Sequence, residues 1–134
     1  MESLTSIKGQ VAVVTGGTAG MGEAAALRFG AEGAKVVVIG RTKEKGDAVV
    51  KKISEAGGEA MFIMAECADE SEVKHATRTI IDNLGRVDIL VNTAGGFIDA
   101  PPLEEVSNAD MRHNFDWNVT AKFLITRELV PVMK

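Results

Sequence analysis

The sequence predicts an α/β fold, a doubly wound parallel sheet truncated after its fourth strand–helix unit. Short apolar runs alternate along the whole chain with longer segments in which apolar residues recur at helical spacing. The runs lack the polar–apolar alternation of a half-exposed strand, as in residues 35–39 (KVVVI), which is typical of strands buried on both faces. Glycines stand where these segments end, at points where the backbone must turn. The length of 134 residues accommodates a single domain, residues 1–134.

The first half of the chain contains three strands and two helices in this prediction. An apolar run at 10–14 is followed by an alanine- and leucine-rich helix at 21–32, which Gly33 ends as a C-terminal cap. A second strand and an amphipathic helix follow, and the paired glycines after that helix stop it before the third strand. These three elements are expected at residues 35–40, 43–56 and 59–64.

The second half supplies two more helices and the fourth strand. Asp69 has an acidic residue three positions later, a pattern that favours a helix start, and Gly85 is expected to end that helix. The fourth strand is expected at 87–91 and a loop at 95–102. Ser107 then begins a last helix, bent, that runs towards the end of the chain. Because crossovers between parallel strands are right-handed, the predicted strand order is 3-2-1-4.

Composition excludes several classes of function. The net charge of −4 gives no electrostatic reason to expect a nucleic-acid partner. No apolar run is long enough to span a bilayer, and the first residues lack the apolar core of a signal peptide. One cysteine cannot form an internal disulfide, so a reducing cytoplasm is the expected location. No cluster of His, Cys, Asp and Glu has the spacing of metal ligands, so no metal is expected.

The loop between the first strand and the first helix, TGGTAGMG, is a candidate phosphate site, because a helix N-terminus presents free N–H groups. In the frame G-x-G-x-x-G/A the match is Gly20, Gly22 and Ala25, which begins well past the strand. In the frame T-G-x-x-x-G-x-G the match begins at Thr15 and Gly16, directly after the strand, and fits better. A glycine-rich turn without a ligand is the alternative, but this position is typical of a Rossmann-like dinucleotide site.

The end of the second strand indicates which dinucleotide is bound. Enzymes that use NAD usually place Asp or Glu there for the ribose 2′-hydroxyl, whereas this chain has Gly40, Arg41 and Thr42. An arginine can form a charge-assisted fork with a 2′-phosphate, and Gly40 is expected to leave room for that group. NADP(H) is therefore predicted over NAD(H), although Arg41 could also be a solvated charge. The missing acid disfavours a methyltransferase-like nucleotide binder.

Three segments together resemble the short-chain dehydrogenases/reductases. They are the glycine loop, residues 92–95 (NTAG) after the fourth strand, and Asn118 within the segment DWNVT of the last helix. The resemblance extends from about residue 8 to residue 134. It implies that the phosphates and the adenosine ribose are lined by Gly16, Thr18, Gly20, Met21 and Gly22.

The resemblance also assigns roles outside the glycine loop. Arg41 would take the 2′-phosphate, and Glu66 would face the adenine where the family usually has aspartate. Asn92, Ala94 and Gly95 would support the sheet and approach the ribose on the nicotinamide side. Asn118 would hold a water in a proton relay. Read without the family, Asn92 could cap a strand end and Asn118 could bond to local backbone.

The chemistry that the resemblance implies is hydride transfer between nicotinamide and a carbonyl or alcohol carbon. The family uses a serine and a Tyr-x-x-x-Lys pair for it, but the sequence has no tyrosine. The chain is therefore expected to hold the cofactor-binding portion of an NADP(H)-dependent oxidoreductase for a small carbonyl or alcohol substrate, and to be inactive by itself. The alternative is a catalytically silent NADP-binding or scaffold module.

Three further expectations concern packing. The fourth strand should form an edge of the sheet, with Val87, Ile89 and Val91 poorly covered. Self-association through this edge or through the last helix would then make the protein a homo-oligomer. Trp117 is expected to pack against the sheet, and Cys67 to be a small buried side chain.

Overall fold

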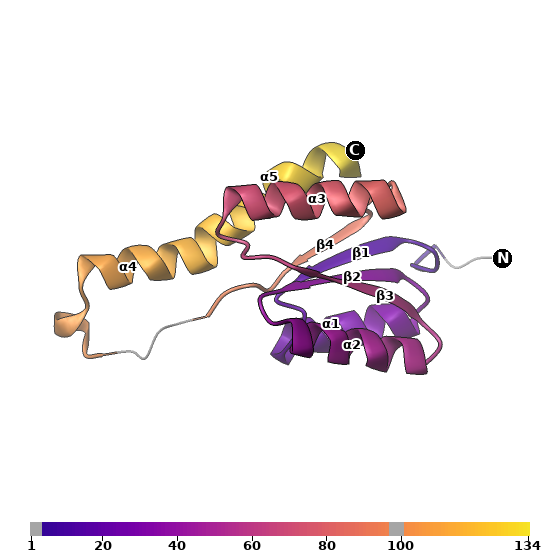
Figure 1. Ribbon diagram of the computed structural model, residues 1–134, viewed down its shortest axis with the longest axis horizontal. Helices are drawn as coiled ribbons and strands as arrows, with labels where there is room; N and C mark the ends of the chain where they lie inside the picture. The colour runs from indigo at the N-terminus through magenta and orange to yellow at the C-terminus, as the bar shows by residue number, and fades with distance from the viewer. Residues whose placement is uncertain (1–3, 97–100) are drawn as a thin grey trace.

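The computed structural model describes residues 4–96 and 101–134 and contains one parallel sheet (Figure 1). The strand order β3-β2-β1-β4 confirms the predicted order. β1 is buried along its whole length, and β2 is buried except at Lys35, because both strands are central and mostly apolar. The bounds of the strands are Val11–Thr15 (β1), Lys35–Gly40 (β2), Glu59–Met64 (β3) and Ile89–Asn92 (β4).

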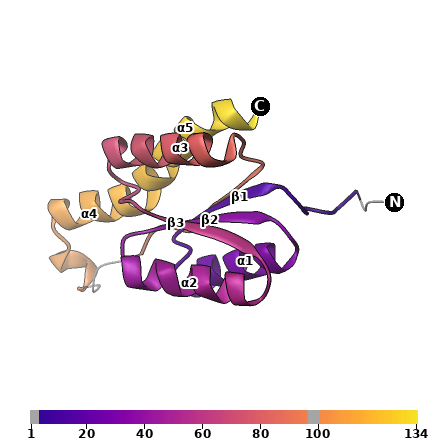
Figure 2. The same ribbon diagram turned by 45° about the vertical axis from the view of Figure 1, so that its right-hand side comes forward.

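Helices cover both faces of the sheet, as a doubly wound fold requires (Figure 2). α1 (Gly20–Ala31) and α2 (Lys43–Glu55) lie on one face. α3 (Glu70–Leu84) and α5 (Ala121–Met133) pack together on the other. The predicted cap of α3 is present, because the Asp69 carboxylate accepts hydrogen bonds from the backbone N–H groups of the first turn.

The last helical segment has three parts that follow one another without a break. α4 (Asn108–Phe115) begins at a capping box between Ser107 and Asp110, as predicted. A π-helical turn, η2 (Asp116–Thr120), then leads into α5. Figure 1 shows α4 reaching beyond the sheet while α5 returns to lie beside α3. A short 3-10 turn, η1 (Leu103–Glu105), precedes α4, and residues 97–100 of the expected loop lie outside the described residues.

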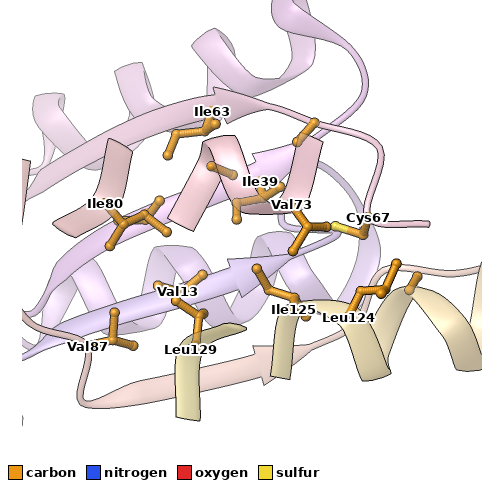
Figure 3. Close-up of a cluster of buried hydrophobic side chains, with 14 of the residues drawn as sticks. Val13, Ile39, Ile63, Cys67, Val73, Ile80, Val87, Leu124, Ile125 and Leu129 are labelled. Atoms are coloured by element: carbon orange, nitrogen blue, oxygen red, sulfur yellow. The ribbon is translucent and has the colours of Figure 1, made fainter. Parts of the chain in front are cut away.

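Two apolar clusters hold these layers together. The cluster under α1 and α2 is the smaller of the two and takes alternate side chains of β1 and β2. The cluster under α3 and α5 is larger, and Figure 3 shows Val73 and Ile80 of α3 and Ile125 and Leu129 of α5 gathered with Val13 and Ile39 of the sheet. No described helix has the length and apolar character needed to cross a bilayer.

The expectation about the fourth strand is wrong for Val87, which is only 2% exposed. The strand begins two residues later than predicted, and Val87 enters the core beneath α3 and α5. Asp88 then turns its carboxylate to the neighbouring strand, where it accepts the Val11 N–H at 2.8 Å. The Arg86 guanidinium and this N–H together hold the pKa of Asp88 below its ordinary value. Ile89 and Val91 are half-buried.

Candidate functional site

A cavity of about 400 Å³ opens where the carboxyl ends of the strands meet. Its walls are the loops that follow β1, β2, β3 and β4, together with Trp117 and Ala121 of the last helical segment. In open α/β sheets this edge is the usual place of a ligand, because loops from several strands converge there. Nine residues predicted from the sequence line it: Gly16, Thr18, Gly20, Met21, Gly22, Arg41, Glu66, Ala94 and Gly95.

The glycine loop brings backbone against backbone at the base of this cavity. Gly16 directly follows β1 and has a φ of +64°, and a Cβ there would lie 2.7 Å from the Ala94 nitrogen. A Cβ on Gly22 would overlap the Gly16 carbonyl. Ala19, the N-cap of α1, provides no capping side chain. The first-turn N–H groups of α1 are thus left for water or an anionic ligand, which fits a pyrophosphate.

Polar bonds from β4 hold this loop in place. Thr15 is fully buried, and its hydroxyl accepts the Ala94 N–H at 3.2 Å. Thr93 donates its own hydroxyl to the Thr15 carbonyl. These two bonds fix the separation between the glycine loop and the loop after β4 at the base of the cavity.

Arg41 leaves the end of β2 and enters the cavity. Its guanidinium lies 3.5 Å from the Glu66 carboxylate and 4.8 Å above the centre of the Trp117 ring. Gly40 lines the same cavity beside Arg41, and its role in leaving room for a 2′-phosphate stays a prediction. A Cβ there would be 2.7 Å from the Thr18 methyl group, so the glycine accommodates Thr18.

Sequence reasoning missed two neighbours of Arg41. Lys45 lines the cavity from the first turn of α2 and has no ion-pair partner in residues 4–96 and 101–134. Thr42, the N-cap of α2, makes no capping hydrogen bond with its side chain and also lines the cavity. The signal was present in the sequence, since Lys45 follows Arg41 by only four residues and lies in the first turn of the expected helix.

Asn118 does not line the cavity but fixes the loop that does. Its carboxamide donates to the carbonyls of Gly96 at 2.7 Å and Asn114 at 2.9 Å, and accepts the Gly96 N–H at 3.1 Å. Lys122 adds a bond from its ammonium group to the Ala94 carbonyl at 3.2 Å, which the sequence did not suggest. Only the bond to Asn114 is the local backbone contact that the alternative described, since Gly96 lies 22 positions away in the sequence.

Asn92 also lies outside the cavity lining. Its amide donates to the Thr126 hydroxyl at 3.0 Å, a contact that links the end of β4 to α5. The side-chain oxygen Oδ1 of Asn92 is buried and has no hydrogen-bond partner among the described residues. The bond to Thr126 ties the end of the sheet to α5, and the role of Asn92 beside a ribose stays a prediction.

Two more side chains complete the cavity. Cys67 is buried as expected, and burial raises the pKa of its thiol to about 11, so the thiol is protonated at neutral pH. Trp117 does not pack against the sheet, which corrects the prediction. Its ring contacts Arg41 and the backbone at Gly96 and forms part of the cavity wall. No group of three or more His, Cys, Asp or Glu gathers among the described residues.

Comparison with known proteins agrees with this fold. A family model described as short chain dehydrogenase matches residues 10–134. The chain belongs to the short-chain dehydrogenase family. A 3beta-hydroxysteroid dehydrogenase of Mediterraneibacter gnavus is 36% identical over 93% of this chain and 45% of its own length. A 3-oxoacyl-[acyl-carrier-protein] reductase of Synechocystis sp. is 38% identical over 97% of this chain and 53% of its own length.

Solved structures also match the fold of this chain. A metagenomic short-chain oxidoreductase in complex with NADP is 36% identical, with a TM-score of 0.90 over 96% of this chain and 58% of its own. A dehydrogenase/reductase of Sinorhizobium meliloti is 39% identical, with a TM-score of 0.90 over 96% of this chain and 51% of its own. The chain spans about half the length of the curated relatives it matches.

Proposed function

We propose that the protein is an NADP(H)-dependent oxidoreductase for a small carbonyl or alcohol substrate, and that residues 1–134 form its coenzyme-binding domain. The observation that supports this proposal is the cavity at the strand ends, where a glycine cradle and an uncapped helix start face two cations of the second strand–helix unit. A bound nicotinamide would supply hydride transfer. The 134 residues contain no tyrosine to act as the proton donor, so they are expected to hold the coenzyme without turnover.

NADP(H) is favoured over NAD(H) by the charges beside β2. Arg41 and Lys45 both line the cavity, and Thr42 leaves its hydroxyl without a capping role. Together with the N-terminus of α2 they could bind a doubly charged phosphate. An acid that would bind the 2′-hydroxyl of NAD is missing at the end of β2. A relative of 36% identity has been solved with NADP, which supports the same choice.

The remaining predicted residues have positioning roles in this proposal. Gly16, Gly20 and Gly22 would face the pyrophosphate, and Glu66 would lie near the adenine. Asn118 would hold the loop after β4 in its place beside the cavity through its bonds to Gly96. A reducing cytoplasm remains the proposed location, because the chain has a single, buried cysteine.

Arg41→Ala should weaken NADPH binding and leave NADH binding nearly unchanged. A charge-assisted bond to a phosphate contributes about 1.5–3 kcal/mol, so the affinity for NADPH should fall about 10- to 100-fold. Isothermal titration of the 134-residue chain with both coenzymes measures the difference. Arg28→Ala is the matched control, since Arg28 is exposed on α1 and pairs with Glu32 outside the cavity. Equal losses for both coenzymes would count against a 2′-phosphate contact.

We also propose that two copies associate through the exposed face of the last helical segment. Met111, Phe115, Val119 and Phe123 recur every fourth residue along it and are 63%, 55%, 48% and 58% exposed. Apolar side chains gathered in this way usually mark a protein contact. The double variant Phe115→Glu and Phe123→Glu should therefore reduce the molar mass measured by light scattering to that of one chain.

Leu103→Glu is the control for this test, because Leu103 is even more exposed, at 86%, but lies in η1, before α4. A wild-type protein that already scatters as a monomer at high concentration would contradict the proposed contact.

A further inference from the structure

Trp117 has an unusual position for the only tryptophan of the chain. It lies in the π-helical turn η2, directly before Asn118, and its side chain lines the cavity. The ring packs on the backbone of the loop after β4, where a Cβ on Gly96 would come within 3.0 Å of it. The Asn118 bonds to Gly96 fix that same loop, so the ring rests on a supported surface.

The Arg41 guanidinium is drawn to two partners of different kinds. Glu66 attracts its N–H groups at 3.5 Å, and Trp117 attracts the cation at 4.8 Å through the electron density of its ring face. The Arg41 side chain is 57% exposed, so its ion pair with Glu66 is weak. Neither partner alone determines where the guanidinium lies.

The two partners differ in which donors they occupy. A carboxylate binds the N–H edge of a guanidinium, which is the edge that a phosphate also needs. An aromatic ring contacts the face of the guanidinium and leaves its five donors available. Support by Trp117 therefore keeps Arg41 in the cavity in a state that can bind phosphate, whereas the bond to Glu66 competes with phosphate.

We propose that Trp117 is a positioning residue that holds Arg41 for a 2′-phosphorylated nucleotide, and that Glu66 opposes it. This inference rests on the proposed function, since it concerns the same cavity and the same arginine. It adds that selectivity for the 2′-phosphate depends on an aromatic ring from the last helical segment, across the cavity from β2. Neither the charge of Arg41 nor the glycine loop requires such a ring.

Two nucleotides that differ only in the 2′-phosphate separate this role from a structural one. Adenosine 2′,5′-bisphosphate and adenosine 5′-monophosphate are titrated into the 134-residue chain, its Trp117→Leu variant and its Trp117→Phe variant. Trp117→Leu should lose about three- to tenfold of the preference for the bisphosphate over the monophosphate, the size expected for a cation–π contact. Trp117→Phe, which keeps a ring, should retain most of the preference.

The variant Glu66→Gln tests the opposing partner while Trp117 stays in place. Removal of the competing carboxylate should raise the affinity for the bisphosphate about threefold or more, in line with a weak exposed ion pair. The chain has one tryptophan and no tyrosine, so its emission at 295 nm excitation reports on this contact directly. The bisphosphate should shift that emission more than the monophosphate does.

Several outcomes would overturn the inference. They are an unchanged preference in Trp117→Leu, an equal loss for both nucleotides, or no gain in Glu66→Gln. If Trp117→Leu does not fold, the Glu66→Gln titration and the tryptophan emission of the wild-type chain still test the inference. A wild-type chain that binds both nucleotides equally would instead contradict the proposed NADP(H) selectivity itself, so the two failures are distinguishable.

Discussion

The substitution Gly22→Ala is expected to lower the free energy of unfolding by about 3 kcal/mol, the upper range for an overpacked site, and to abolish nucleotide binding. Gly22 is buried in the first turn of α1, and an added Cβ would overlap the Gly16 carbonyl and the Thr93 hydroxyl. Neither neighbour can move freely, because Gly16 is backbone in a tight turn and Thr93 is bonded to the Thr15 carbonyl. The helix start would have to shift away from the cavity.

Gly20→Ala is the matched control for this prediction. Gly20 also lies in the first turn of α1, but a Cβ there would meet nothing within 4 Å. Its φ of +55° still makes alanine unfavourable, by about 1–2 kcal/mol. Urea unfolding followed by circular dichroism measures both variants. If Gly22→Ala proved no less stable than Gly20→Ala, close packing of the loop would not be the reason for this glycine.

The sequence was most informative where one local force dominates. β2 and β3 have the predicted bounds, because their apolar runs are dense and glycines stand beside both. The caps at Asp69 and Ser107 were also predicted, since each depends on residues within one turn. The family motifs then identified the loops that line the cavity, and strand order followed from the handedness of crossovers.

The sequence was least informative where contacts join distant parts of the chain. The start of β4 is set by Asp88, which bonds to a residue 77 positions earlier. The contact of Gly40 with Thr18, which comes from another loop, also had no signal in the sequence. Trp117 was assigned to the sheet because no local pattern reveals the π-helical turn that carries it to Arg41. Each of these depends on packing that exists only after the layers have assembled.

The substitution Leu129→Ala should also lower the stability strongly, because it removes a buried side chain that packs α5 into the larger apolar cluster. Leu129 is fully buried on α5, in the cluster between the sheet and α3 (Figure 3). Loss of a buried leucine side chain costs about 3–5 kcal/mol, part of it from the cavity that remains. Since small domains have a free energy of unfolding of only about 5–15 kcal/mol, a large part of the protein's stability would be lost.

Val130→Ala, at the next position of α5, is the control, because Val130 is 38% exposed and its loss should cost well under 1 kcal/mol. Urea midpoints of the two variants give the comparison, and equal midpoints would contradict the assigned packing of α5. Leu129→Ala leaves the glycine loop and Arg41 intact, whereas Gly22→Ala alters the loop itself. The folded fraction of Leu129→Ala at low temperature should therefore still bind adenosine 2′,5′-bisphosphate. Leu129 does not line the cavity, and the contacts of α5 with it come from Ala121, in its wall, and Lys122, which bonds to the Ala94 carbonyl.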